Sequence, residues 1–187
     1  MSTTNLFVEL IVIGVGAATW LVLTILAIFG WRWLPASQVL GAASLIPALS
    51  VIYLLGILTD RLADSMFERL WVKRLRLHHF EDAAAYHKAR VLILTQSERL
   101  AELLEYGRSR LRICRGWAMN AVLIAIALNW FVWSELEGVP GQAMMSVVGS
   151  IVFMGIAGLA YYSWRSLAVT EYRKVSDQSR HLAATTR

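Results

Sequence analysis

Several residue types are scarce in this chain of 187 residues. It contains one cysteine, Cys114, and four histidines. A single cysteine excludes an internal disulfide, and one thiol without a neighbouring His or Cys excludes a zinc site of the usual kind. Because no histidine lies within a long apolar stretch, a haem held by two histidines inside a membrane is excluded as well.

Motifs of the common enzyme classes are also missing. The sequence has no glycine-rich phosphate loop, no Ser/His/Asp arrangement and no paired carboxylates at catalytic spacing. A group of His, Asp and Glu residues lies between His78 and His87, and we interpret its members as surface residues rather than metal ligands. We therefore expect no enzymatic activity and no catalytic, cofactor-binding or metal site.

Charged residues are absent from four long stretches, at 10–31, 39–58, 117–133 and 143–164. The chain is 57% apolar and its mean hydropathy is +0.54, both high for a water-soluble protein. As helices, these stretches are long enough, or nearly so, to cross a hydrocarbon core of about 30 Å. We therefore predict an all-α membrane protein with four transmembrane helices and a helical cytoplasmic insert between helices 2 and 3. The expected divisions are 1–58, 59–116, 117–164 and a basic tail at 165–187.

Basic residues give the expected orientation in the membrane. Between residues 60 and 115 there are twelve Lys and Arg against eight Asp and Glu. Lys and Arg accumulate on the cytoplasmic side, so the insert, the tail and the N-terminus are predicted to be cytoplasmic. The first ten residues contain no Lys or Arg, so they lack the charged start of a secretory signal. We expect a multi-pass protein of the cell inner membrane.

The insert is expected to be helical throughout. Apolar residues recur every four positions from Leu58 to Leu70, which predicts that the second span continues as an amphipathic stalk. A break is expected at 77–80. Thr95 and Glu98 have the spacing of a capping box, so a new helix is predicted from about residue 96 to about residue 134.

Charged residues form two bands along that long helix. The bands lie on approximately one face and comprise Glu98, Glu102 and Glu105, then Arg108, Arg112 and Arg115. In an oligomer they would form an acidic ring and a basic ring that select ions. In the alternative interpretation the arginines contact anionic lipid headgroups, each contributing about 1 kcal/mol. Both interpretations stay open.

Polar residues at the edge of or within the apolar stretches are further candidates. Glu9 borders the first stretch, where an ionisable group suggests a proton or cation site paired with an arginine such as Arg61 or Arg115. The alternative is a carboxylate near the headgroups that reaches water. Asn120 and Asn129 lie on opposite faces of one helix, so each is expected to bond a different neighbouring helix.

Small residues line two sides of the last span. Gly149 and Ser150 lie on one face, and Gly155 and Gly158 lie on the other. Small residues allow helix backbones to approach closely in a membrane, which predicts helix packing and favours a homo-oligomer.

The outline of four spans with a helical insert resembles many small bacterial membrane proteins, including oligomeric effectors and sensors of antiphage and stress systems. The resemblance transfers no residues. We expect an oligomeric bacterial inner-membrane protein that acts as a pore, channel or gated effector or sensor with a cytoplasmic helical collar. The alternative is a docking subunit that recruits a cytoplasmic protein. Anionic lipids are expected partners, and nucleic acid is not, because the basic segment lacks interleaved aromatic residues.

Overall fold

The computed structural model describes residues 3–32, 42–96 and 98–185, in which helices are the only regular structure. In chain order the elements are α1 (Thr3–Phe29), α3 (Ala42–Phe67), the π-helical turn η1 (Glu68–Val72), α4 (Lys73–Leu77), α5 (Ala83–Gln96), α6 (Glu98–Glu135) and α7 (Gln142–Thr185).

Four helices are long and apolar enough to cross a membrane, which confirms the predicted number. They comprise Leu6–Phe29, Leu45–Leu77, Arg99–Glu135 and Gln142–Leu182. The second continues from α3 through η1 into α4 without interruption, as the four-residue spacing of its leucines predicts. The chain is thus all-helical, with four candidate membrane-spanning helices.

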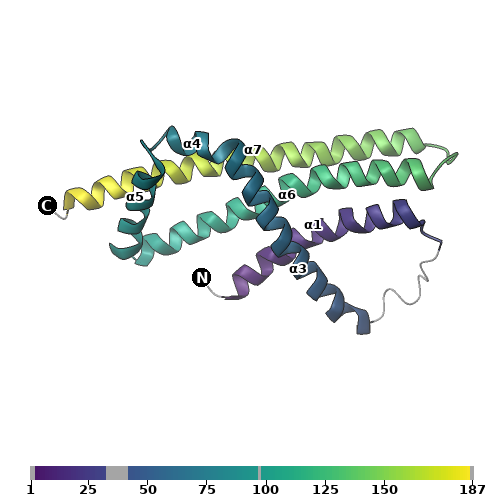
Figure 1. Ribbon diagram of the computed structural model, residues 1–187, viewed down its shortest axis with the longest axis horizontal. Helices are drawn as coiled ribbons and strands as arrows, with labels where there is room; N and C mark the ends of the chain where they lie inside the picture. The colour runs from purple at the N-terminus through teal and green to yellow at the C-terminus, as the bar shows by residue number, and fades with distance from the viewer. Residues whose placement is uncertain (1–2, 33–41, 97, 186–187) are drawn as a thin grey trace.

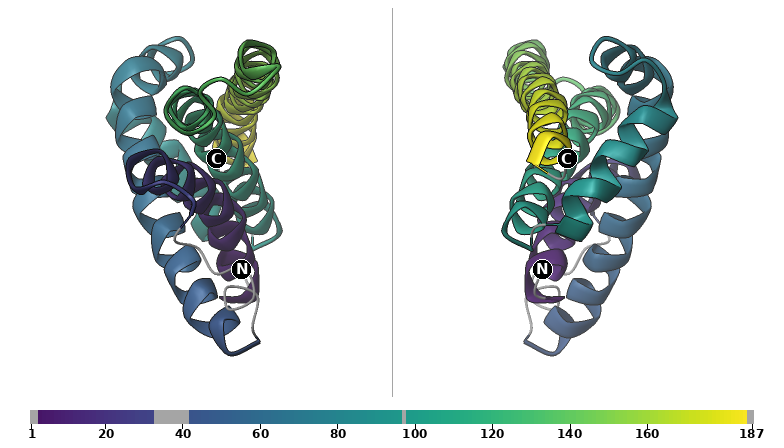
Figure 2. Two further views of the ribbon diagram at one scale, coloured as in Figure 1. Left: turned by 90° about the vertical axis from the view of Figure 1, so that its right-hand side faces the viewer. Right: turned by 90° about the vertical axis from the view of Figure 1, so that its left-hand side faces the viewer.

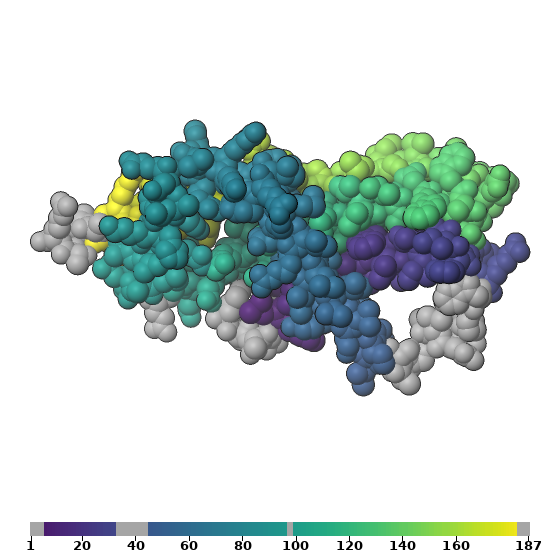
Figure 3. All heavy atoms as spheres, viewed as in Figure 1, coloured from purple at the N-terminus to yellow at the C-terminus, as the bar shows by residue number. Residues whose placement is uncertain are grey.

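The long helices do not form a uniform bundle. Helix α6 lies between α1 and α7 and runs alongside both, whereas α3 crosses α1 at an angle (Figure 1). Seen along the long axis, α3 and α4 form one side of the molecule and α7 lies toward the other (Figure 2). The start of α3 projects from the rest of the chain (Figure 3), where Leu45 is 60% and Ile46 is 76% exposed.

Glycines set the crossing of α1 and α3. A Cβ atom at Gly14 would overlap the backbone carbonyl oxygen of Ile52, and one at Gly56 would overlap that of Leu10. The two backbones therefore approach as closely as small residues permit.

Polar side chains within the apolar stretches bond neighbouring helices. The Asn120 side-chain amide donates to the Ile13 carbonyl in α1 at 2.8 Å. The Asn129 amide donates to the Ser150 hydroxyl in α7 at 2.7 Å. This confirms that the two asparagines connect α6 to different neighbours.

Beyond the apolar stretches, α4 and α5 pack against the extended ends of α6 and α7. Phe67, Trp164 and Trp71 form an aromatic cluster between α3, η1 and α7. Farther along, Ile93 of α5 packs with buried apolar side chains of α6 and α7. These two clusters stabilise the part of the molecule that lies beyond the apolar stretches.

The predicted break after Leu77 and the predicted start of α6 are close to the observed ones, but the predicted cap of α6 is wrong. The break after Leu77 is present, and α6 begins at Glu98, two residues later than expected. Thr95, however, lies in the last turn of α5, where its hydroxyl donates to the Val91 carbonyl at 3.0 Å. A threonine hydroxyl can bond the preceding turn within a helix. Thr95 therefore belongs to α5, which ends at Gln96, and does not cap α6.

Candidate functional site

An ion-pair network joins α1, α3 and α6 where their apolar stretches end. Arg112 places Nη1 at 3.4 Å from Glu9 Oε2 and Nε at 3.3 Å from Asp60 Oδ2. Arg115 donates from Nη2 to Asp60 Oδ1 at 2.8 Å and from Nη1 to Asp64. One acidic residue of α1 and two of α3 are therefore connected through two arginines of α6.

The spacing of charges along two helices produces this network. Arg112 and Arg115 are three residues apart on α6, and Asp60 and Asp64 are four residues apart on α3. Each pair therefore lies on one face of its helix. Two carboxylates directly after the apolar part of α3 meet two guanidinium groups directly before the apolar part of α6.

The part of the network around Glu9 and Asp60 is withdrawn from solvent, whereas the Asp64 side chain is 55% exposed. Glu9 is 5% exposed and Asp60 is 8% exposed. The Ser109 hydroxyl donates a further hydrogen bond to Glu9 Oε1. Buried charges are tolerated only when they are paired and hydrogen-bonded, so the positions of these three helices depend on one another.

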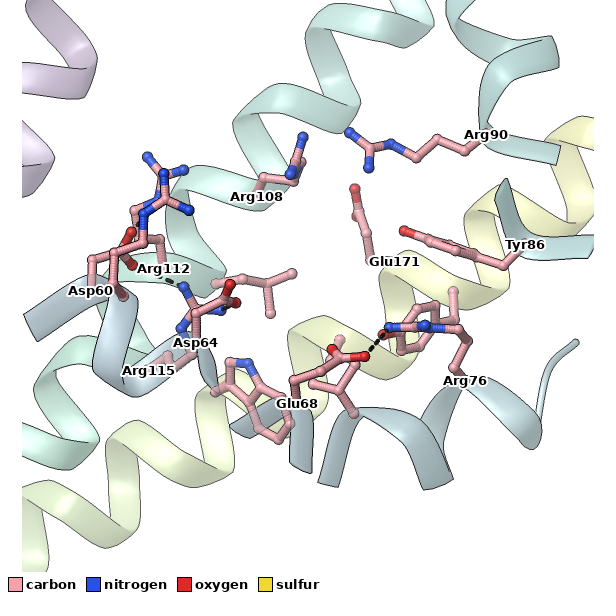
Figure 4. Close-up of a pocket in the computed structure, with 16 residues that line it drawn as sticks. Asp60, Asp64, Glu68, Arg76, Tyr86, Arg90, Arg108, Arg112, Arg115 and Glu171 are labelled. Atoms are coloured by element: carbon pink, nitrogen blue, oxygen red, sulfur yellow. Dashed lines mark hydrogen bonds and ion pairs between the residues drawn. The ribbon is translucent and has the colours of Figure 1, made fainter. Parts of the chain in front are cut away.

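A charged cavity of about 300 Å³ opens beside the network (Figure 4). Its walls come from α3, η1, α4, α5, α6 and α7, and they include Arg112 and Arg115. Part of the wall is fixed by a second ion pair, in which Arg76 donates to Glu68 at 2.7 Å and also lies over the ring of Tyr86. The cavity and the network therefore share two arginines.

Four charged side chains lining the cavity make no ion pair among the described residues. They are Arg61 of α3, Arg90 of α5, Arg108 of α6 and Glu171 of α7. The charged ends of Arg90, Arg108 and Glu171 extend toward the same region (Figure 4). Two positive groups from different helices thus face one cavity without a carboxylate partner. This arrangement attracts an anionic group.

Glu171 completes the charged surface of the cavity. Its Oε1 atom is buried without a hydrogen-bond partner among the described residues. This oxygen lies close to the backbone of α6 at Gly107, where an added Cβ atom would be 2.5 Å from it. Glu171 follows the last apolar stretch of α7, and burial there raises its pKa, while the Lys174 charge opposes the shift. A buried carboxylate oxygen without a donor is a position for a ligand hydroxyl or ammonium group.

The residues that line the cavity indicate which kind of ligand it could bind. Its lining holds arginines, carboxylates, Tyr86 and Tyr172, and it has no Ser, Cys, Lys or His. Within the described part of the chain, no group of three His, Cys, Asp or Glu side chains is placed to hold a metal ion. A small polar ligand with an anionic group and a hydrogen-bond donor matches the available partners.

The structure separates the residues of the two predicted charge bands. Arg112 and Arg115 bind carboxylates of their own chain, whereas Arg108 lines the cavity. Glu102 is exposed, and Glu105 lines a small cavity that also contains Glu9. The side chain of Glu98 lies outside the described residues.

Glu9 pairs with a different arginine from those expected. The sequence suggests an arginine such as Arg61 or Arg115, and the structure places another arginine, Arg112, beside Glu9. Arg115 lies three residues farther along α6 and reaches Asp60 and Asp64 instead. The longitudinal position of α6 along α1 decides which arginine meets Glu9, and this position is a tertiary property.

The four predicted packing residues of α7 have different surroundings. Gly149 lies against Leu128 of α6, and Ser150 accepts the hydrogen bond from Asn129. A Cβ atom at Gly155 or Gly158 would meet nothing within 4 Å. One face of α7 therefore packs within the chain, and the other presents its glycines outward.

Sequence reasoning missed Asp60, Asp64, Arg90 and Glu171. The aspartates carry a signal, because two carboxylates four residues apart follow an apolar stretch directly. Arg90 and Glu171 carry no such signal, since only the packing of α5 and α7 beside α6 brings them together.

Comparison with protein-family models, curated proteins and solved structures finds no match to this chain.

Proposed function

We propose that the chain is a gated membrane effector: an oligomeric multi-pass protein of the bacterial inner membrane whose charged cavity binds a small anionic ligand. In this proposal the N-terminus, the segment from residue 59 to 116 and the tail are cytoplasmic. The end of α1 and the α6–α7 turn lie together at the opposite end of the molecule, which supports this orientation (Figure 1). The chain acts without enzymatic chemistry.

The observation that carries the proposal is the sharing of Arg112 and Arg115 between the cavity and the network. An anion in the cavity competes with Asp60 for these guanidinium groups. Weakening their bonds to α1 and α3 favours a different arrangement of the helices. Ligand binding would thereby act on the candidate membrane-spanning helices directly.

A conducting form requires several copies of the chain. Asn120, Asn129, Ser146 and Ser150 bond within the chain, so they do not offer a polar surface for a pore. The projecting start of α3 provides an apolar face for contacts between copies. We therefore place the pore or channel between chains.

The test combines mass photometry in mild detergent with ion flux from vesicles. The wild-type protein should be oligomeric and should conduct. Replacing Arg90 and Arg108, two of the unpaired cavity arginines (Arg90→Gln, Arg108→Gln), should change the flux about fivefold or more, a typical size for coupling between two sites, and should leave the oligomer intact. Arg110→Gln is the matched control, because Arg110 is exposed on the same helix and lies outside the cavity. A monomer without flux contradicts the proposal.

The second candidate function is a docking subunit, which is supported by a separate groove. Helices α5 and α7 form a largely apolar groove of about 500 Å³ that includes Ala89, Val91 and Leu92. Val91 is 42% exposed, and Leu94 nearby is 41% exposed. An amphipathic helix of a cytoplasmic protein would fit this surface. Two results together would favour docking. The wild-type protein should conduct no ions, and Val91→Glu should lose binding of a purified cytoplasmic protein that the wild type binds.

A further inference from the structure

A basic cavity of about 600 Å³ lies between α4 and α7, on a different side of α7 from the charged cavity. Its charged lining comprises Arg74, Arg165 and Arg173, together with His78 and His79. No Asp or Glu lines it, and the three arginines make no ion pair among the described residues. Arg165 and Arg173 are two turns apart on one face of α7.

An apolar groove of about 420 Å³ adjoins this basic cavity. It lies between α3, η1, α6 and α7, and every side chain that lines it is apolar or aromatic. Ala118 to Leu123 of α6 and Ala157 to Tyr161 of α7 contribute to it. These segments belong to the predicted spans, so the groove lies at the depth where lipid chains would be.

Two aromatic residues form part of both surfaces. Trp71 and Tyr161 line the basic cavity and the apolar groove, and their ring centroids are 5.2 Å apart. Phe67 and Trp164 pack behind them. Trp71 lies in the π-helical turn η1, an element that is frequent at functional sites. The two surfaces are therefore continuous, with the aromatic pair at their boundary.

We infer that this composite surface binds an anionic phospholipid, with its phosphate against Arg74, Arg165 and Arg173 and an acyl chain in the apolar groove. The charge complements an anionic headgroup, and basic pockets between helices at the cytoplasmic surface are typical headgroup sites. The order of the surfaces matches the molecule, since the apolar part adjoins the spans and the basic part lies beyond them. The inference rests on the membrane-spanning part of the proposed function and not on gating.

Native mass spectrometry of the detergent-solubilised protein tests the headgroup part. We expect phosphatidylglycerol to bind in preference to phosphatidylcholine with the same acyl chains. The triple variant Arg74→Gln, Arg165→Gln, Arg173→Gln should lose this preference, by about 100-fold if each arginine contributes about fivefold. Lys174→Gln is the matched control, because it removes a charge from the same helix outside the cavity. The corresponding triple Lys variant should keep the preference, which separates loss of charge from misfolding.

A pair of glycine variants tests the groove. Gly158 lines the groove and Gly155 does not, yet a Cβ atom at either meets nothing within 4 Å. Gly158→Leu should therefore reduce binding of both lipids, and Gly155→Leu should leave it unchanged.

Three results would overturn the inference. Equal binding of the two lipids by the wild-type protein excludes a headgroup site. If the oligomer still conducts ions in that case, the proposed gated effector stands without the lipid site. Binding of soluble glycerol phosphate as tight as that of phosphatidylglycerol indicates a site for free phosphate. Loss of the oligomer in Gly158→Leu, with lipid binding unchanged, assigns the groove to a second copy of the chain.

Discussion

Replacing Arg112 tests whether the network fixes the arrangement of α1, α3 and α6. Arg112→Met keeps an unbranched side chain but leaves Glu9 and Asp60 without their shared cation. Breaking a buried ion pair by removing one partner costs about 3–5 kcal/mol. The lower end applies, because Glu9 keeps the Ser109 hydroxyl and Asp60 keeps Arg115.

We therefore expect a loss of about 3 kcal/mol in the free energy of unfolding, which is roughly a 100-fold change in the equilibrium constant. Reversible unfolding in mixed micelles of increasing dodecyl sulfate content measures it, with fluorescence of the eight tryptophans as the signal. Arg110→Met is the control, since Arg110 is exposed on the same helix and lies over the ring of Tyr106.

A double-mutant cycle with Glu9→Gln separates the internal ion pair from a contact with lipid headgroups. If Arg112 stabilises the chain through Glu9, removing both charges should cost less than the sum of the single changes, by about 1–2 kcal/mol. If Arg112 instead binds lipid phosphate, its replacement should cost the same with or without the Glu9 carboxylate. A coupling energy near zero would refute our interpretation of the network.

Three further predictions follow from other parts of the structure. Gly56→Leu should destabilise the protein by about 1–3 kcal/mol because its side chain overlaps the backbone of α1, whereas Gly155→Leu should have little effect in the same unfolding assay; equal effects would contradict the close crossing. Because burial raises the pKa of Glu171, stability should fall as pH rises from the usual value for glutamate toward the raised one, and Glu171→Gln should flatten that part of a stability-against-pH curve. For orientation, a cysteine at Gly138 should react with an impermeant reagent outside the cell and one at Ala84 should not, after replacement of the native cysteine; the opposite labelling would reverse the proposed topology.

Local patterns along the chain were enough to predict the helices of this protein. Hydropathy and apolar spacing are properties of neighbouring residues, so they locate four long helices, the extension of α3 and the break after Leu77. They also place Asn120 and Asn129 on opposite faces, because helical periodicity fixes that relation without knowledge of the neighbours. The start of α6 was harder to predict from its cap. The Thr95 hydroxyl could bond either the preceding turn or the amides that follow it, and the sequence does not distinguish these two partners.

Which charges meet depends on how the helices pack against one another. Arg108, Arg112 and Arg115 recur at intervals of three or four residues, so a shift of one helical turn in α6 would exchange their partners. Contacts of Gly16 with Asn120, and of Gly116 with Ile13, set the position of α6 along α1. The sequence cannot supply that position, because it depends on how two surfaces fit together rather than on either helix alone.

The same limit applies to both proposed binding sites. Arg90 and Glu171 come from helices that are distant in sequence, and only the packing of α5 and α7 around α6 encloses the cavity between them. Trp71 is an isolated aromatic residue in the sequence, yet the π-helical turn and the neighbouring α7 place it beside Tyr161, at the boundary of a basic and an apolar surface. Local periodicity determined the helices, and the close packing of their side chains determined what their surfaces can bind.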